Sequence, residues 1–131
     1  MIPPDIISQK TDTLIKKIQK NPKKSFYWYD LNAIQQWALL INTRHNKIFQ
    51  ARFAMKANSN PTIVKTLYKS DIRIDACSEY EAHHAMKFWV SPLHIQVSSQ
   101  QSPSDRTSLY SKWISCVATS LNQLQDFCTS V

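Results

Sequence analysis

The segment Phe53-Ala54-Met55-Lys56-Ala57-Asn58-Ser59-Asn60-Pro61 decides the fold that this sequence predicts. Three apolar residues lead into one lysine, a short polar turn follows, and the proline suits the first position of a helix. The pattern predicts a strand over about 48–56 that ends at Lys56, and then a helix from Pro61 to about Tyr68. An amine at the carboxyl end of a barrel strand is well placed to react with a carbonyl compound.

Strand and helix patterns alternate along the rest of the chain, with short links between them. We expect further strands at 72–77, 94–97 and 114–118, and helices at about 78–89, at 102–113 and from Ser120 onward. This alternation predicts an α/β fold with a parallel sheet, as in a partial (β/α)8 TIM barrel of about four βα units. A complete barrel typically needs about 250 residues, and this chain has 131.

The N-terminal part differs from the rest in its charge. Residues 1–24 contain six lysines and two aspartates, so they carry +4 of the total net charge of +7. Apolar residues share one face of a predicted helix over 5–20. We therefore expect a basic amphipathic arm at 1–25 and a barrel domain at 26–131. The lysines are not interleaved with aromatic residues, so we expect a solvated helix face and neither a nucleic-acid nor a membrane partner.

An aromatic segment leads into the expected barrel domain. Residues 25–29 predict a short strand or an extended arm, and Asp30 suits the N-cap of a following helix. The predicted buried face of that helix consists of Leu31, Ile34, Trp37, Ala38 and Ile41. The four tryptophans are expected in or over the core, although Trp89 and Trp113 could instead form exposed apolar surface.

The composition excludes several classes of site. The chain has no glycine, where average usage gives about nine, so it contains no P-loop, no GxGxxG and no GxSxG motif. No apolar run reaches the roughly 20 residues of a membrane span, and the N-terminus lacks a signal-peptide pattern. The three cysteines form no CxxC pair. We expect a reduced, cytoplasmic chain.

No metal site is predicted from the histidines or cysteines. His83 and His84 are adjacent, so on a helix they point about 100° apart and lack the i, i+4 spacing of paired ligands. We expect them to be exposed or half-buried helix residues. Cys77 is expected to be a small buried residue at a strand end.

Four blocks of sequence, in this order, resemble the fold type III decarboxylases that use pyridoxal 5'-phosphate, and the diaminopimelate decarboxylases of lysine biosynthesis in particular. The blocks are Phe26–Leu31, Phe53–Pro61, Ile74–Glu81 and Val90–Ile95. The resemblance implies an alanine racemase-like N-terminal barrel domain, represented by its first half. It also implies a small amino-acid substrate and, for the complete enzyme, a homodimer.

The resemblance assigns roles to two residues. Lys56 would carry the pyridoxal 5'-phosphate covalently, and Asp75 would lie near the cofactor and the lysine amine. Ser78 and Glu81 also fall on matched positions, but as an S-x-x-E capping box they start a helix without any chemistry.

The sequence also departs from the family pattern. Tyr80 stands where the family usually has a glycine, and Ser70, Trp89 and Trp113 occupy helix ends where glycine is the usual terminator. The chain stops before the family's glycine-rich phosphate loop, its acidic partner of the pyridine nitrogen and the histidine that stacks on the ring.

Three functions therefore stay open. The first is a truncated amino-acid decarboxylase that uses pyridoxal 5'-phosphate and resembles the diaminopimelate enzyme. The second is an inactive remnant or interaction module of this family. The third is a protein that binds the cofactor without decarboxylating an amino acid. Binding of the cofactor that depends on Lys56 separates the second from the other two.

Overall fold

The computed structural model describes residues 4–20, 25, 27–45 and 50–129, which fall into two compact units, residues 1–30 and 31–131. In the first unit, helix α1 (Pro4–Lys20) confirms the helix expected at 5–20. The described residues of 25–29 form no strand, so that alternative is wrong; Phe26 lies outside the described residues. The rings of Tyr27 and Tyr29 stack with their centroids 6.3 Å apart. The proposed domain boundary near residue 25 stays a prediction.

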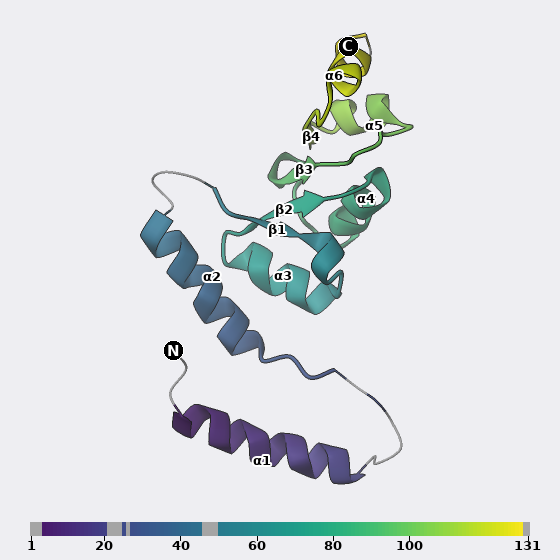
Figure 1. Cartoon of the computed structure of the whole chain (residues 1–131). Coiled ribbons are helices and arrows are strands. Elements are labelled where there is room, and N and C mark those ends of the chain that lie inside the picture. The colour runs from purple at the N-terminus through teal and green to yellow at the C-terminus, as the bar shows by residue number, and fades with distance from the viewer. Residues whose placement is uncertain (1–3, 21–24, 26, 46–49, 130–131) are drawn as a thin grey trace. The chain divides into compact units, whose positions relative to one another are not determined.

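The second unit is a parallel α/β sheet with its connecting helices (Figure 1). The strands are β1 (Arg52–Ala54), β2 (Arg73–Ala76), β3 (Ile95–Val97) and β4 (Ser115–Cys116), paired in that order. The helices are α2 (Leu31–His45), α3 (Pro61–Lys69), α4 (Glu79–Lys87), α5 (Arg106–Ser111) and α6 (Leu121–Cys128), with the short 3-10 helices η1 (Met55–Ala57) and η2 (Pro92–His94). The α/β class and the parallel sheet confirm the expectation, and the four described strands do not close a barrel.

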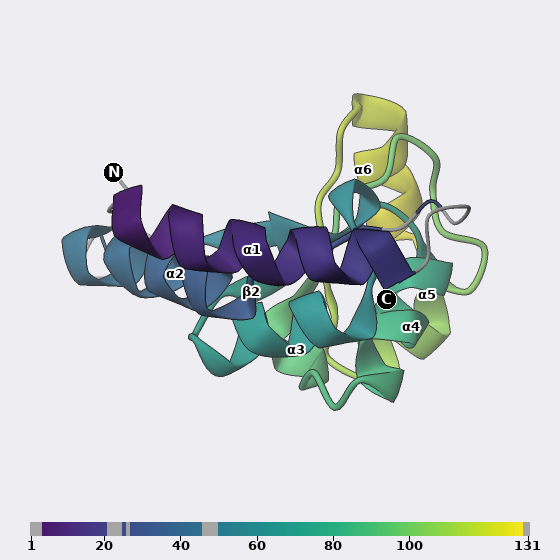
Figure 2. The same ribbon diagram turned by 90° about the horizontal axis from the view of Figure 1, so that it is seen from below.

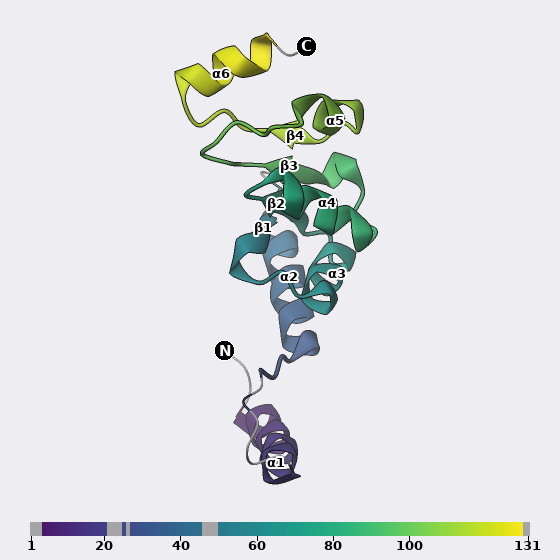
Figure 3. The same cartoon turned by 90° about the vertical axis from the view of Figure 1, so that its right-hand side faces the viewer.

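The two faces of the sheet differ in polarity because successive side chains alternate. Ile74, paired with Ile95, and Ala76, paired with Val97, are buried in the core cluster. Val64 of α3, Ala82 and Ala85 of α4 and Leu109 of α5 belong to the same cluster. Figure 3 shows these three helices on one side of the sheet, and α2 lies against α3 (Figure 2). The opposite face of the sheet carries polar residues.

Several observed element ends differ from the predicted ones. β1 ends at Ala54, and Lys56 lies in η1 instead of ending the strand. Asp75 is inside β2, since Ala76 still belongs to the strand. The helix expected from 102 begins at Arg106, because the Asp105 side chain accepts a hydrogen bond from the Ser108 backbone N–H at 3.1 Å and so forms the N-cap.

Three helices end in the left-handed turn that glycine usually makes. Among the described residues, positive φ occurs at Asp71 (61°), Trp89 (64°) and Trp113 (63°). The residue after each of them is buried and donates its N–H to a carbonyl five positions earlier. These bonds join Ile72 to Leu67 (3.1 Å), Val90 to Ala85 (3.4 Å) and Ile114 to Leu109 (3.1 Å). Each end is therefore a Schellman motif built without glycine.

The predictions for these ends and for the tryptophans are partly corrected. Glycine-like geometry is confirmed at Trp89 and Trp113, but at the end of α3 it falls on Asp71 and not on Ser70, which is the C-cap. Trp89 and Trp113 are 76% and 78% exposed, so their alternative as exposed apolar surface is right. Trp28, Trp37 and Ile41 are exposed as well, so their predicted burial is wrong.

Glu79 links the start of α4 to the start of α5. Its carboxylate accepts hydrogen bonds from the Asp105 backbone N–H at 2.9 Å and from the Ser104 hydroxyl. These bonds favour the ionised form and hold the pKa of Glu79 below its usual value, the Asp105 N–H having the largest effect.

We expect Trp113→Gly to raise the free energy of unfolding by about 1 kcal/mol, because a bulky residue with positive φ costs about that much relative to glycine. Trp89→Gly should gain less, since it also loses a contact between Lys65 and the ring. Urea denaturation measures the change. Tyr80→Gly is the matched control, an exposed aromatic inside α4 that should lower stability by about 1 kcal/mol. A loss of stability in Trp113→Gly would contradict this account.

We expect Glu79→Gln to lower the free energy of unfolding at neutral pH and to lower it less at acidic pH. Because the folded-state pKa of Glu79 is depressed, its contribution is present above the unfolded pKa and is lost as the pH falls through the folded value. Unfolding midpoints of both proteins between pH 7 and about pH 3 should converge toward the acid end. Curves that stay parallel over this range would show that the carboxylate is not tied to Asp105.

Candidate functional site

Lys56 lies on a tight turn directly after β1. The Asn58 backbone N–H donates to the Met55 carbonyl at 3.0 Å, which closes η1 around the lysine. Met55 is fully buried in the core, so the backbone on one side of Lys56 is anchored, while the Lys56 side chain is exposed. An anchored backbone with an accessible amine suits a group that reacts with a carbonyl compound.

Asp75 lies on the polar face of β2, in register with Ala54 of β1 and Gln96 of β3. Its Oδ1 accepts a hydrogen bond from the Ser98 hydroxyl at 2.6 Å and a long contact from Gln96 Nε2 at 3.5 Å. Ser98 is itself fixed, because its backbone N–H donates to the Ala76 carbonyl at 2.9 Å. Residues of β3 and of the position directly after it therefore orient the carboxylate of β2.

Cys77 directly follows β2, at the carboxyl end of the strand. Burial and then the hydrogen bond with Glu81 raise the pKa of the Cys77 thiol, whereas the positive charge of Lys56 lowers it. The η1 turn that carries Lys56 lies against β2. Cys77 is half-buried and so less covered than predicted. Lys56 follows β1, and Asp75 and Cys77 lie near and directly after the end of β2, so all three belong to the edge where the parallel strands end.

Ser78 and Glu81 form the predicted cap. Ser78 Oγ accepts from the Glu81 backbone N–H at 3.2 Å, and the Glu81 carboxylate accepts from the Cys77 N–H at 2.9 Å. The start of α6 repeats this arrangement with Ser120 and Gln123, whose side-chain oxygen accepts from the backbone N–H one residue before the serine. The Glu81 carboxylate and the Gln123 amide thus each accept a hydrogen bond from a backbone N–H just before a helix, and the sequence predicted the cap formed by Ser78 and Glu81.

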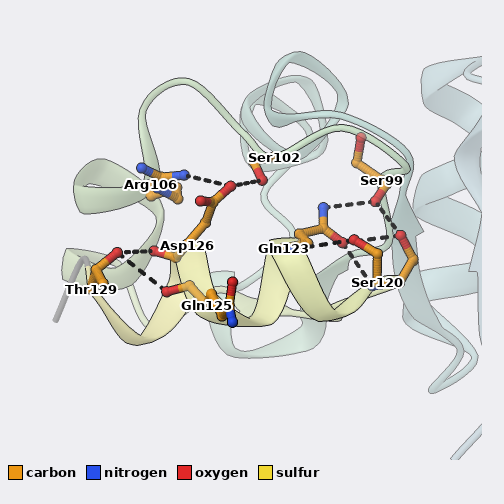
Figure 4. A network of polar contacts seen from close by, with 9 residues as sticks. Ser99, Ser102, Arg106, Ser120, Gln123, Gln125, Asp126 and Thr129 are labelled. Carbon is orange, nitrogen blue, oxygen red and sulfur yellow. Dashed lines mark hydrogen bonds and ion pairs between the residues drawn. The ribbon is translucent and has the colours of Figure 1, made fainter.

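Helix α6 holds the segment that follows β3 in place (Figure 4). The buried Gln123 donates from Nε2 to the Ser99 carbonyl at 3.0 Å. Asp126 accepts from the Ser102 hydroxyl at 2.7 Å and pairs with Arg106 at 3.7 Å. These contacts fix the chain immediately after Ser98, the residue that orients Asp75.

Ser98 and Gln96 were not singled out from the sequence. The signal was the alternation of apolar and polar residues at 95–98, which sends Gln96 and Ser98 to the same face as Asp75. The same face carries a pair of like charges, because Arg52 and Arg73 are in register on neighbouring strands. Burial, and then the charge of Arg73, lower the pKa of Arg52.

The histidines take part in helix packing. His83 Nδ1 lies 2.8 Å from the Glu79 carbonyl, and the His84 ring lies between the rings of Tyr80 and Phe88. Both are half-buried, as expected. Within the described ranges, no three His, Cys, Asp or Glu residues are grouped so that they could hold a metal ion. No helix in the described part of the chain is long and apolar enough to cross a membrane.

The fold is similar to that of solved decarboxylases. The arginine decarboxylase of Paramecium bursaria Chlorella virus matches with a TM-score of 0.77 and 15% identity, over 90% of this chain and 33% of that one. Its structure bound to agmatine gives 0.78 and 16% over the same shares. A variant of diaminopimelate decarboxylase from Helicobacter pylori, complexed with L-lysine, gives 0.73 and 24% over 88% and 31%.

The chain spans about a third of the length of each of these structures. No protein-family model matches the sequence, and no curated protein matches it either. At these identities the likeness shows the fold: a parallel sheet with helices arranged as in part of these decarboxylases.

We expect Lys56→Gln to slow the alkylation of Cys77 by iodoacetamide at mildly alkaline pH. Removing the ammonium removes the charge that lowers the thiol pKa, so less thiolate is present. Peptide mass spectrometry reports the rate at Cys77 separately from the other cysteines. Lys65→Gln, on α3, is the control and should leave the rate unchanged. Equal rates in Lys56→Gln and the unaltered chain would place the lysine away from Cys77.

Proposed function

We propose that this chain carries pyridoxal 5'-phosphate on Lys56 as part of an amino-acid decarboxylase similar to diaminopimelate decarboxylase. The observation that supports this most is the position of Lys56. It is an exposed amine on an anchored turn after β1, at the sheet edge where Asp75 is held by Ser98. The fold of the sheet is that of part of two solved amino-acid decarboxylases.

The described residues fit the carbonyl end of this cofactor. The Lys56 side chain is accessible, and Asp75 supplies a carboxylate on the polar face of the neighbouring strand. The chain holds no glycine, so it contains no glycine-rich loop for the phosphate group. The described residues thus fit the covalent attachment of the cofactor aldehyde to Lys56. In the proposed enzyme the phosphate group would be bound by other residues.

Bound pyridoxal 5'-phosphate would act as an electron sink when an amino acid loses its carboxylate. The chain's own part is to position groups around that chemistry. The buried Met55 side chain fixes the backbone beside Lys56, and the amine can take up or release a proton once it is free. Ser98 keeps one oxygen of Asp75 occupied, which orients the other oxygen of the carboxylate.

The structural neighbours support a particular substrate class. They are an arginine decarboxylase, also solved with agmatine, and a diaminopimelate decarboxylase complexed with L-lysine; these four compounds all carry an amino or guanidinium group at the end of the side chain. We propose a substrate of this kind, with diaminopimelate first. The homodimer and the cytoplasmic location inferred from the sequence belong to the same proposal.

We expect the purified chain, mixed with pyridoxal 5'-phosphate, to develop an absorbance band at the edge of the visible range. Borohydride should then fix the cofactor irreversibly, and peptide mass spectrometry should find it on Lys56. Lys56→Arg keeps the charge but not the reactive amine, so it should abolish the band. Lys65→Arg, also on the second unit, is the matched control and should keep it.

The outcomes separate the proposals. Cofactor on surface lysines in no preference to Lys56 would contradict the assigned site. Specific labelling of Lys56 without release of carbon dioxide from diaminopimelate, arginine or ornithine would support cofactor binding. It would contradict decarboxylase activity for this chain alone. The same assay on a longer chain that contains the remaining strands then tests the reaction itself.

A further inference from the structure

A pocket of about 270 Å³ opens between the last turns of α3 and α4. It is lined by Lys65, Tyr68, Lys69, Phe88 and Trp89. The helices run back from the carboxyl ends of the strands, so their C-terminal turns lie at the opposite edge of the sheet from Lys56. The pocket therefore shares no residue with the candidate cofactor site.

The walls of the pocket combine positive charge with aromatic surface. Lys65 and Lys69 are four residues apart on one helix, a spacing at which like charges repel. Among the described residues neither lysine forms an ion pair. Lys65 Nζ lies 3.7 Å from the centroid of the Trp89 ring, so the ammonium is held beside the apolar wall. An anion with an apolar body complements this surface in both charge and polarity.

Trp89 occupies its place at an energetic cost. Its backbone has φ 64°, a conformation in which a bulky residue is strained, and its side chain is 76% exposed. Glycine would make the same turn without strain and without exposing an indole to water. The strained turn does direct the ring to the rim of the pocket beside Lys65. Trp113 has the same backbone geometry, but it does not line this pocket.

Hydrogen bonds hold Tyr68, one of the residues that line the pocket. The Tyr68 hydroxyl accepts from the Ser91 backbone N–H at 3.2 Å and lies 3.2 Å from His94 Nδ1. Tyr68 thereby joins α3 to η2, the segment after Trp89. A ligand would meet a preformed surface, which lowers the entropic cost of binding.

We propose that this pocket binds a small aromatic carboxylate. The carboxylate pairs with Lys65 and Lys69, and the flat apolar body contacts Phe88 and Trp89. A volume of about 270 Å³ accommodates a two-ring molecule such as naphthoate. The proposal does not rest on Lys56, so it holds or fails independently of cofactor binding.

The ligand arm of the test uses naphthoate and the neutral naphthalene methanol of the same shape. Each is titrated into the isotope-labelled chain, and amide and indole N–H resonances are followed by NMR. We expect saturable shifts at Lys65, Lys69, Phe88 and Trp89, with the alcohol binding about tenfold more weakly because it lacks the charge-assisted contacts. Equal binding of both compounds, or shifts elsewhere, would overturn the proposal.

The protein arm uses Trp89→Gly and Trp113→Gly as a matched pair. Both remove an exposed indole and relieve the same strained turn, so both should fold at least as stably as the parent chain. Only Trp89→Gly should lose naphthoate binding. Lys65→Gln and Lys69→Gln should each weaken naphthoate and leave the alcohol unchanged. Undiminished naphthoate binding by Trp89→Gly would refute the site.

Discussion

The three left-handed helix ends are the constraint on which the rest of the sheet depends. At Asp71, Trp89 and Trp113 the chain reverses from a helix to the next strand, and in each case the following residue is buried. After Asp71 and Trp113 this residue leads directly into β2 and β4 and so sets where those strands enter the sheet, whereas η2 lies between Val90 and β3. Without glycine the turns are strained, and the buried apolar residue on the far side of each turn offsets that strain.

The two proposed sites lie at different edges of the sheet. Parallel register gathers the strand ends: Ser98, directly after β3, contacts Asp75 of β2, and Lys56 follows the end of β1 at the same edge. The opposite edge receives the helix ends, where Trp89 and two lysines line a pocket. The proposed cofactor site and the proposed binding pocket therefore lie at opposite edges of the sheet and share no residue. The strained turns belong to the pocket edge, and the tight η1 turn belongs to the chemical edge.

The parts of this structure that local sequence determines were predictable. The cap at Ser78 and the Pro61 start of α3 involve hydrogen bonds within four residues, and both are as expected. Strand ends were not predictable in the same way, because they are set by ladder partners on other strands. The predicted strand therefore extended to Lys56, which lies in η1. Ser98 was missed for the same reason, since its contact with Asp75 spans 23 residues. The exposure of Trp37 likewise depends on tertiary packing that an amphipathic pattern does not encode.

The central claim is that the sheet brings Lys56 to the edge where β2 and β3 end. A nitroxide label at Ser59→Cys, in a chain whose three native cysteines are replaced by alanine, measures this directly by paramagnetic broadening. Ser59 is exposed and lies beside the η1 turn. The account predicts strong broadening of the Ser78 and Ser98 amide resonances, and sharp indole resonances for Trp89 and Trp113. Broadened indoles with unaffected Ser78 and Ser98 would contradict it.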